Sequence, residues 1–166
     1  MKDKLAKTFK TVAVGGTFDE LHKGHRTLLI KAFEIGEQVL IGLCSDEFVR
    51  KLGKPHITAP YEQRLDELKA FLREYGFSER AKILPLNDIY GVTLSKGCLE
   101  ALVVSKETKP TALKINEERK KRNLPPLYID VIDMVPSENH IPISTTRIRR
   151  GEIDREGRLL KKLHSH

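Results

Sequence analysis

Two histidines lie three residues apart, directly after an apolar run. They belong to the segment GGTFDELHKGH, residues 15–25, which follows FKTVAV. An apolar run that breaks at two glycines and resumes as a helical pattern predicts a strand, a sharp turn and a helix. A helix N-terminus offers unpaired N–H groups and the positive end of a dipole, so the turn favours a bound phosphate. His22 and His25 would lie beside that anion.

The small and polar residues of the same segment would complete a phosphate site. Gly15 and Gly16 permit backbone conformations that other residues resist and leave room for a ligand, and Gly24 would do the same at the helix entrance. Thr17 adds a hydroxyl, and Phe18 follows it in the turn. The segment matches neither of the two commonest phosphate loops, because GxGxxG and a GK[ST] ending are both absent.

The histidine pair also allows a second interpretation, a zinc site. Cys44 or His56 would then supply further ligands. No other residues show metal-ligand spacing, so we expect no metal centre held by the protein itself.

The composition is that of a globular chain. Its 166 residues are 39% apolar and 32% charged, which predicts a single domain over 1–166, with a core at about 10–152 and a tail at 153–166. The net charge of +7 allows either anionic small molecules or nucleic acid as partners. Cys44 and Cys98 lack a CxxC or secretory pattern, so we expect both to be reduced and buried. We see neither an apolar N-terminal signal nor a run long enough to span a bilayer, and therefore expect a cytoplasmic protein without membrane contact.

Strands and helices are predicted to alternate along the chain. Five apolar runs, each followed by polar or helical sequence, predict parallel strands covered on both faces: KTVAVG, QVLIGLC, AKILPL, ALVVS and LYIDVIDMV. Helices are predicted at about 25–35, closed by a left-handed Gly36, at 60–76, and at 111–123, where 117–123 would be a solvated face. This alternation predicts a single-domain, doubly wound, Rossmann-like α/β fold with a five-stranded parallel sheet. Ligands of such sheets lie outside the carboxyl ends of the strands.

A second motif stands late in the chain. The segment ISTTRIRRG, residues 143–151, places a serine and two threonines where a helix would begin. HKGH matches the HxGH signature of the nucleotidylyltransferase superfamily, and ISTTRIR resembles its ISSTxIR element. LGKPHITAPYEQR, ALVVSKET and YIDVIDMVPSENHIPISTTRIR resemble the archaeal and eukaryotic branch of the phosphopantetheine adenylyltransferases. The resemblance covers roughly residues 10–152.

This resemblance implies a reaction. The family transfers an adenylyl group from ATP to 4'-phosphopantetheine, giving dephospho-coenzyme A and pyrophosphate in coenzyme A synthesis, with Mg²⁺ accompanying ATP through phosphate oxygens. The attacking group is already an ionised phosphate, so no activated side-chain nucleophile is required, and neither a GxSxG elbow nor a Cys/His signature occurs. Positioning and charge stabilisation would supply the catalysis.

The resemblance also implies roles for single residues. His25 would stabilise the charge that develops at the α-phosphate, and His22 would contact the triphosphate. Lys54, or Lys51 close to it in sequence, would neutralise the nucleophilic phosphate, which Thr17 would touch. The further binding residues would be Gly15, Gly16, Phe18 and Gly24 in the turn, Ser144, Thr145 and Thr146 around the β- and γ-phosphates, and Arg147 or Arg149 beside them.

The chain departs from the bacterial members in two places. Those members carry a threonine in place of the first motif histidine and an arginine in the turn after the fourth strand. Here the two places hold His22 and SKET, residues 105–108. Ser105 would then begin the turn as a binding residue, and Lys106 would replace the arginine charge.

Several alternatives stay open. The two motifs also fit another acceptor, such as nicotinamide mononucleotide, FMN or an alcohol phosphate. A non-catalytic nucleotide- or RNA-binding module would account for the charge, but no RNA-recognition or KH signature occurs and aromatic residues are few, so we expect no nucleic-acid partner. The final segment RLLKKLHSH would form a short docking helix or fray. The oligomeric state is open, since a helix face used between subunits resembles one used in the core.

Overall fold

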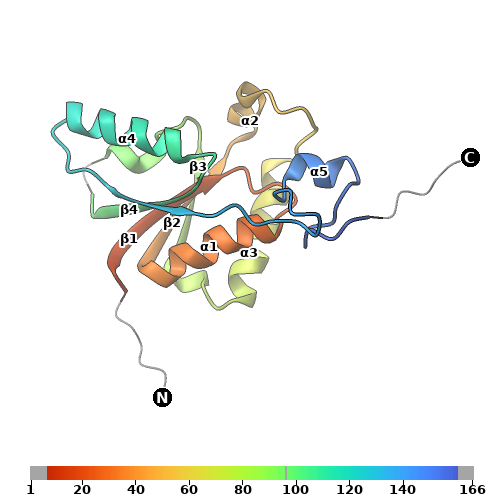
Figure 1. Cartoon of the computed structure of the whole chain (residues 1–166). Coiled ribbons are helices and arrows are strands. Elements are labelled where there is room, and N and C mark those ends of the chain that lie inside the picture. Colours follow the sequence, from red (N-terminus) through yellow and green to blue (C-terminus); the bar gives the residue numbers. More distant parts are fainter. Residues whose placement is uncertain (1–6, 96, 161–166) are drawn as a thin grey trace, which may run out of the picture.

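The computed structural model describes residues 7–95 and 97–160 and is built on a five-stranded sheet (Figure 1). Its strands are β1 (Phe9–Gly16), β2 (Gly36–Cys44), β3 (Ala81–Leu86), β4 (Leu99–Ser105) and β5 (Tyr128–Ile132). The strand order is β3-β2-β1-β4-β5, and every neighbouring pair is parallel. The predicted α/β fold with a five-stranded parallel sheet is confirmed.

Helices cover both faces of this sheet (Figure 1). The helices α1 (Lys23–Ile35) and α3 (Tyr61–Glu74) pack on one face, and α4 (Lys109–Lys121) packs on the other. Successive residues of β1 explain the two layers, because Val12 and Val14 join the core with α1 and α3 while Ala13 joins the core with α4. The short elements α2 (Asp46–Leu52), α5 (Thr145–Arg149) and the 3₁₀ turns η1 (Ser78–Arg80) and η2 (Gly91–Leu94) lie in the connections.

The strand order reverses at β1. The chain continues from β1 to β2 and β3 on one side, and then returns to β4 and β5 on the other. Loops that leave neighbouring strands towards opposite faces open a crevice between their carboxyl ends. The histidine turn follows β1 and the SKET turn follows β4, so both stand at this crevice.

Two local predictions are wrong, and a third, the solvated face at 117–123, holds at most positions but has one buried exception. Gly36 is extended (φ −115°) rather than left-handed, because β2 follows α1 without a loop; a Cβ on Gly36 would lie 2.6 Å from Val12 Cγ2, so close packing requires the glycine. Cys98 is exposed, since it stands in the bend before β4, whereas Cys44 is buried as expected. The expected solvated face at 117–123 includes Arg119, which is only 4% exposed and donates to two backbone carbonyls.

The segment after α5 folds back against the rest of the chain. Ile153 is fully buried and forms an isolated antiparallel bridge with Leu159, and residues 153–160 contain no helix. The suggested docking helix, RLLKKLHSH, begins at residue 158, so the structure describes only its first three residues. The last six residues of RLLKKLHSH lie outside the described residues. None of the helices in the described ranges has the length and apolar character needed to cross a membrane.

Candidate active site

A cavity of about 590 Å³ opens at the carboxyl ends of the strands. One group of lining residues is polar and comes from the β1–α1 turn, the loop before α3 and the start of α5. A second group is apolar and comes from β3, η2, β4 and α4, and it includes Leu86, Ile89, Val92, Leu102, Val104 and Ile115. A concave apolar site with a few convergent polar groups, at the switch point of an α/β sheet, is typical of a small-molecule site.

The cavity brings together most of the predicted site residues. Those that line it are Gly15, Gly16, Thr17, Phe18, His22, Gly24, His25, Lys54, Ser105, Ser144, Thr145 and Thr146. The two motifs, about 120 residues apart in sequence, therefore share one site. Lys51, Lys106 and Arg147 are not brought to it.

The two motif histidines cap helix α1 reciprocally. His22 Nδ1 accepts hydrogen bonds from the N–H groups of Gly24 (3.0 Å) and His25 (3.3 Å), and His25 Nδ1 accepts from the His22 N–H at 3.2 Å. The imidazoles stack with their centroids 3.6 Å apart, and the buried Phe18 ring meets His25 edge-on. Because each Nδ1 is an acceptor, each ring carries its proton on Nε2. The Nε2–H group of each ring is therefore its hydrogen-bond donor.

Both imidazoles are held neutral. Burial, with the nearby Arg26 and Arg155 charges, lowers the pKa of His22 to about 4. Burial also lowers the pKa of His25 well below its usual range, helped by His22 and by the charge of Lys54. At neutral pH the pair therefore offers two Nε2–H hydrogen-bond donors rather than two positive charges.

The N–H groups at the start of α1 all have partners. The histidine rings satisfy those of His22, Gly24 and His25, and the Lys23 N–H donates to the Arg155 carbonyl at 2.8 Å. The expectation of unpaired N–H groups at this helix is therefore wrong. An anion here would meet the imidazole donors and the positive end of the helix dipole instead.

Backbone strain after β1 lies at residues that carry side chains and not at the two glycines that precede the turn. Gly15 and Gly16 lie within β1, and a Cβ at these positions would lie 3.3 Å from the side chains of Leu86 and Phe18 respectively. The expectation of an unusual backbone at Gly15 and Gly16 is therefore wrong. A larger residue at either position would crowd the side chains of Leu86 and Phe18. Phe18 (φ 50°) and Glu20 (φ 57°) adopt the left-handed conformation that L-residues resist.

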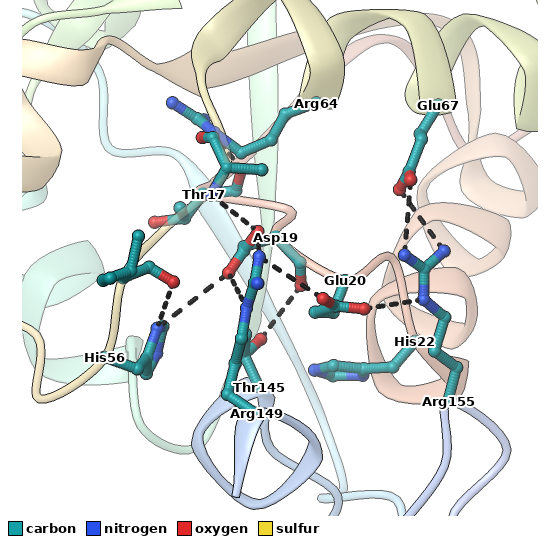
Figure 2. Close-up of polar contacts among 12 residues, drawn as sticks. Thr17, Asp19, Glu20, His22, His56, Arg64, Glu67, Thr145, Arg149 and Arg155 are labelled. Carbon is teal, nitrogen blue, oxygen red and sulfur yellow. Dashed lines mark hydrogen bonds and ion pairs between the residues drawn. The ribbon is translucent and has the colours of Figure 1, made fainter. Parts of the chain in front are cut away.

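The second motif forms the N-terminus of α5, beside the first. Ser144 is the N-cap, and its Oγ accepts from the Arg147 N–H at 3.2 Å. Thr145 Oγ1 donates to the Asp19 carbonyl at 3.0 Å, which joins the two motifs directly (Figure 2). The N-cap role of Ser144 and its place in the cavity are compatible, as expected.

Neither Arg147 nor Arg149, the two arginines expected beside the phosphates, lines the cavity. Arg147 donates to Ser137 Oγ, Asn139 Oδ1 and the Ile141 and Pro142 carbonyls, and pairs with Glu152, so it holds the preceding loop. Arg149 instead pairs with Asp19 at 2.8 Å and Glu20 at 3.3 Å (Figure 2). Both arginines therefore stabilise the loops around the site through these contacts.

The three candidate lysines differ in whether they line the cavity. Lys54 lines the cavity, and its charge contributes to the lowered pKa of His25. Lys51 is 70% exposed and lies 3.6 Å from Glu47, its neighbour on α2. Lys106 lies 3.4 Å from Asp133, which itself lines the cavity although Lys106 does not. Of the two competing lysines, the geometry favours Lys54.

The sequence interpretation missed two buried charged residues that hold the site. The Asp19 carboxylate, 2% exposed, accepts from Arg149 and from the Ala59 N–H at 3.2 Å, and lies 3.9 Å from His56 Nδ1. Arg64, 1% exposed, donates to the carbonyls of Cys44 and Ala59 and to the Asp46 carboxylate. It also donates to the Thr17 carbonyl, beside which it lies in Figure 2. A signal for Arg64 exists, since it stands four residues before Leu68 on the apolar face of α3.

The zinc alternative finds no ligand set in the part of the chain that the structure describes. Within residues 7–95 and 97–160, no three His, Cys, Asp or Glu side chains are grouped so that they could hold a metal ion.

Known proteins resemble this chain over most of its length. The Cytidylyltransferase-like family matches residues 13–151. The phosphopantetheine adenylyltransferase of Methanopyrus kandleri is 49% identical over 146 residues, covering 88% of this chain and 92% of the relative. That of Methanothermobacter thermautotrophicus is 45% identical, covering 96% and 94%.

Solved structures show the same fold. A protein of unknown function from Archaeoglobus fulgidus superposes with a TM-score of 0.67 at 34% identity, covering 74% of this chain and 89% of that one. The bifunctional NMN adenylyltransferase/ADP ribose pyrophosphatase of Francisella tularensis gives a TM-score of 0.60 at 18% identity, covering 86% and 41%. With the family match and the close relatives, this chain belongs to the cytidylyltransferase-like family and, within it, to the archaeal phosphopantetheine adenylyltransferases.

Proposed function

We propose that this protein transfers the adenylyl group of ATP to 4'-phosphopantetheine, producing dephospho-coenzyme A and pyrophosphate. The observation that carries the proposal is the cavity in which both motifs meet, lined on its polar side by His22, His25 and Lys54. Relatives that are 45–49% identical over most of the chain carry the name of this activity.

The chemistry needs little from the protein beyond placement. An oxygen of the acceptor phosphate attacks the α-phosphorus of ATP, the new P–O bond forms, and the bond to the β-phosphate oxygen breaks to release pyrophosphate. His25 Nε2–H donates to the α-phosphate oxygens as charge accumulates there, and His22 donates to the triphosphate. Donors fixed in advance stabilise such charge without reorganisation. Reciprocal capping and stacking fix these two rings.

The other polar residues hold the two phosphate-bearing ends. Lys54 neutralises the acceptor phosphate, and the Thr17 hydroxyl contacts it. Ser144, Thr145 and Thr146 contact the β- and γ-phosphates from the start of α5. Their position in the cavity lining supports these roles.

The apolar lining suits the long, uncharged arm of phosphopantetheine. Leu86, Ile89 and Val92 come from the β3–η2 segment, and Leu102 and Val104 come from β4. An aliphatic chain with two amides buries its apolar surface against such residues. FMN and nicotinamide mononucleotide would present flat ring systems there instead.

Mg²⁺ enters with ATP as part of the substrate. Magnesium keeps several waters and is commonly bound through phosphate oxygens with one or two carboxylates, so it needs no protein cage. ATP and phosphopantetheine are the proposed small-molecule partners, and a single domain acting in the cytoplasm is proposed.

The test is pyrophosphate release from ATP and Mg²⁺ in the presence of 4'-phosphopantetheine, nicotinamide mononucleotide, FMN or no acceptor. The proposal expects release only with phosphopantetheine, and its collapse in His25→Ala. Release with another acceptor would overturn the substrate, and ATP binding without release in any arm would favour a non-catalytic nucleotide-binding module.

A further inference from the structure

The segment 152–160 lies beyond the family match, which ends at residue 151, yet it contacts the first motif. The Arg155 carbonyl accepts the Lys23 N–H at 2.8 Å, and Glu156 pairs with Arg26 on the next turn of α1. Burial of Ile153 anchors the segment in the core. The start of α1 is thus capped from both sides, by the histidine rings and by this segment.

The Arg155 side chain joins two further elements (Figure 2). Its Nε donates to Glu20 Oε2 at 2.9 Å, in the turn after β1. Its Nη1 and Nη2 donate to the two carboxylate oxygens of Glu67 on α3, each at 3.3 Å. A forked guanidinium suits such a paired arrangement, which a lysine ammonium cannot reproduce.

One of these carboxylates belongs to a strained residue. Glu20 has a φ of 57°, a conformation that side-chain-bearing residues adopt only when the surroundings impose it. Arg155 and Arg149 both hold its carboxylate. Glu20 stands two residues before His22, so its backbone sets the direction in which the chain enters α1.

We propose that Arg155 is a positioning residue for the His22–His25 pair. Its carbonyl completes the cap of α1, and its guanidinium keeps Glu20 in the left-handed conformation that leads into the capping histidine. Arg155 acts through these neighbours and does not touch the reacting groups. The inference rests on the proposed function, which gives the histidine pair its task at the phosphates.

The experiment compares Arg155→Ala and Arg155→Lys with Arg158→Ala. Arg158 is the matched control, because it belongs to the same segment, its side chain is 72% exposed, and among the described residues it pairs only with Asp154, at 2.7 Å. Two quantities are measured for each variant: kcat for pyrophosphate release, and the hydrogen-exchange rates of the Lys23 amide and of the β1 amides.

We expect Arg155→Ala to lower kcat roughly 10- to 100-fold, the scale of a misplaced catalytic group. The Lys23 amide should exchange faster while β1 amides keep their protection. Arg155→Lys should recover part of kcat, since it can pair with one carboxylate, and Arg158→Ala should resemble wild type.

The inference is overturned if Arg155→Ala keeps kcat within about twofold, if Lys23 exchange is unchanged, or if Arg158→Ala loses as much activity. Equal loss of protection in β1 would also overturn it, by assigning Arg155 to general stability. Wild type without pyrophosphate release would refute the proposed function, and Lys23 exchange would still decide whether Arg155 closes the cap.

Discussion

Gly24→Ala is a sharp probe of the histidine pair, because the added methyl group meets the His22 ring. A Cβ on Gly24 would lie 2.9 Å from His22 Cε1 and 3.0 Å from Nδ1, whereas ordinary contact begins at 3.4 Å. The ring must move by about 0.5 Å. It cannot swing away freely, since it caps two N–H groups and stacks on His25.

The expected effect on the rate is large. A misplacement of about 1 Å can cost about 100-fold, so a shift of half that size should lower kcat about 10- to 100-fold. This corresponds to about 1.4 to 2.7 kcal/mol in the activation barrier. Stability should change little, because the loss of about 1 kcal/mol from a weakened cap opposes a similar gain from replacing glycine within a helix.

The assay measures pyrophosphate release under saturating substrates and unfolding by urea on the same samples. Gly97→Ala is the matched control, because a Cβ there would have no atom of another described residue within 4 Å, its chain neighbours aside. A kcat for Gly24→Ala within about threefold of wild type would refute the claim that ring placement controls the rate, as would an equal loss in the Gly97 variant.

Three further predictions concern charge. Lys54→Ala should raise the KM for phosphopantetheine at least about tenfold while exposed Lys51→Ala leaves it unchanged, and equal effects in steady-state kinetics would contradict the assignment. Arg64→Met should destabilise the fold by about 3 to 5 kcal/mol in urea denaturation, because the partners of a buried guanidinium are left unpaired, whereas Arg73→Ala on the exposed side of α3 should stay within about 0.5 kcal/mol. Stability should fall as the pH drops from about 6.5 towards 4, by up to about 1.4 kcal/mol per pH unit, because His22 binds a proton in the unfolded chain but has a pKa of about 4 when folded. Thermal unfolding between pH 6.5 and 4 should show a smaller loss of stability in His22→Asn than in wild type. An unchanged dependence of stability on pH in this variant would exclude His22 as the source of the loss.

The sheet was readable from the sequence because its three central strands, β1, β2 and β4, contain buried runs rich in Val, Ile and Leu. The edge strands β3 and β5 are only partly buried, yet their apolar runs are also visible, and all five runs are strands of the parallel sheet. The apolar periodicity of α3 was equally clear, and Gly76 beyond its end is left-handed at φ 72°. Gly36 was predicted wrongly because the sequence around it does not distinguish a glycine that packs against Val12 from a glycine that ends a helix.

The site was readable only where residues cluster in motifs. His22 and His25 could be placed at the crevice because their turn follows β1, the strand at which the strand order reverses, whereas Ser144 was assigned to the same site through the resemblance of ISTTRIR to a family motif. Arg64 shows only its place on the apolar face of α3, which indicates burial but not its partners, and Arg155 carries no signal. Their partners stand 47 and 135 residues away, at Thr17 and Glu20, so only the folded chain reveals what they hold.

The most direct test of the central claim follows labelled oxygen. Phosphopantetheine carrying ¹⁸O at every non-ester phosphate oxygen is incubated with ATP, Mg²⁺ and the protein, and the products are analysed by mass spectrometry. Attack by the acceptor phosphate on the α-phosphorus predicts dephospho-coenzyme A that retains every labelled oxygen, one of them bridging to AMP, and unlabelled pyrophosphate. Loss of a labelled oxygen from that product, label in pyrophosphate, or no dephospho-coenzyme A would contradict the account.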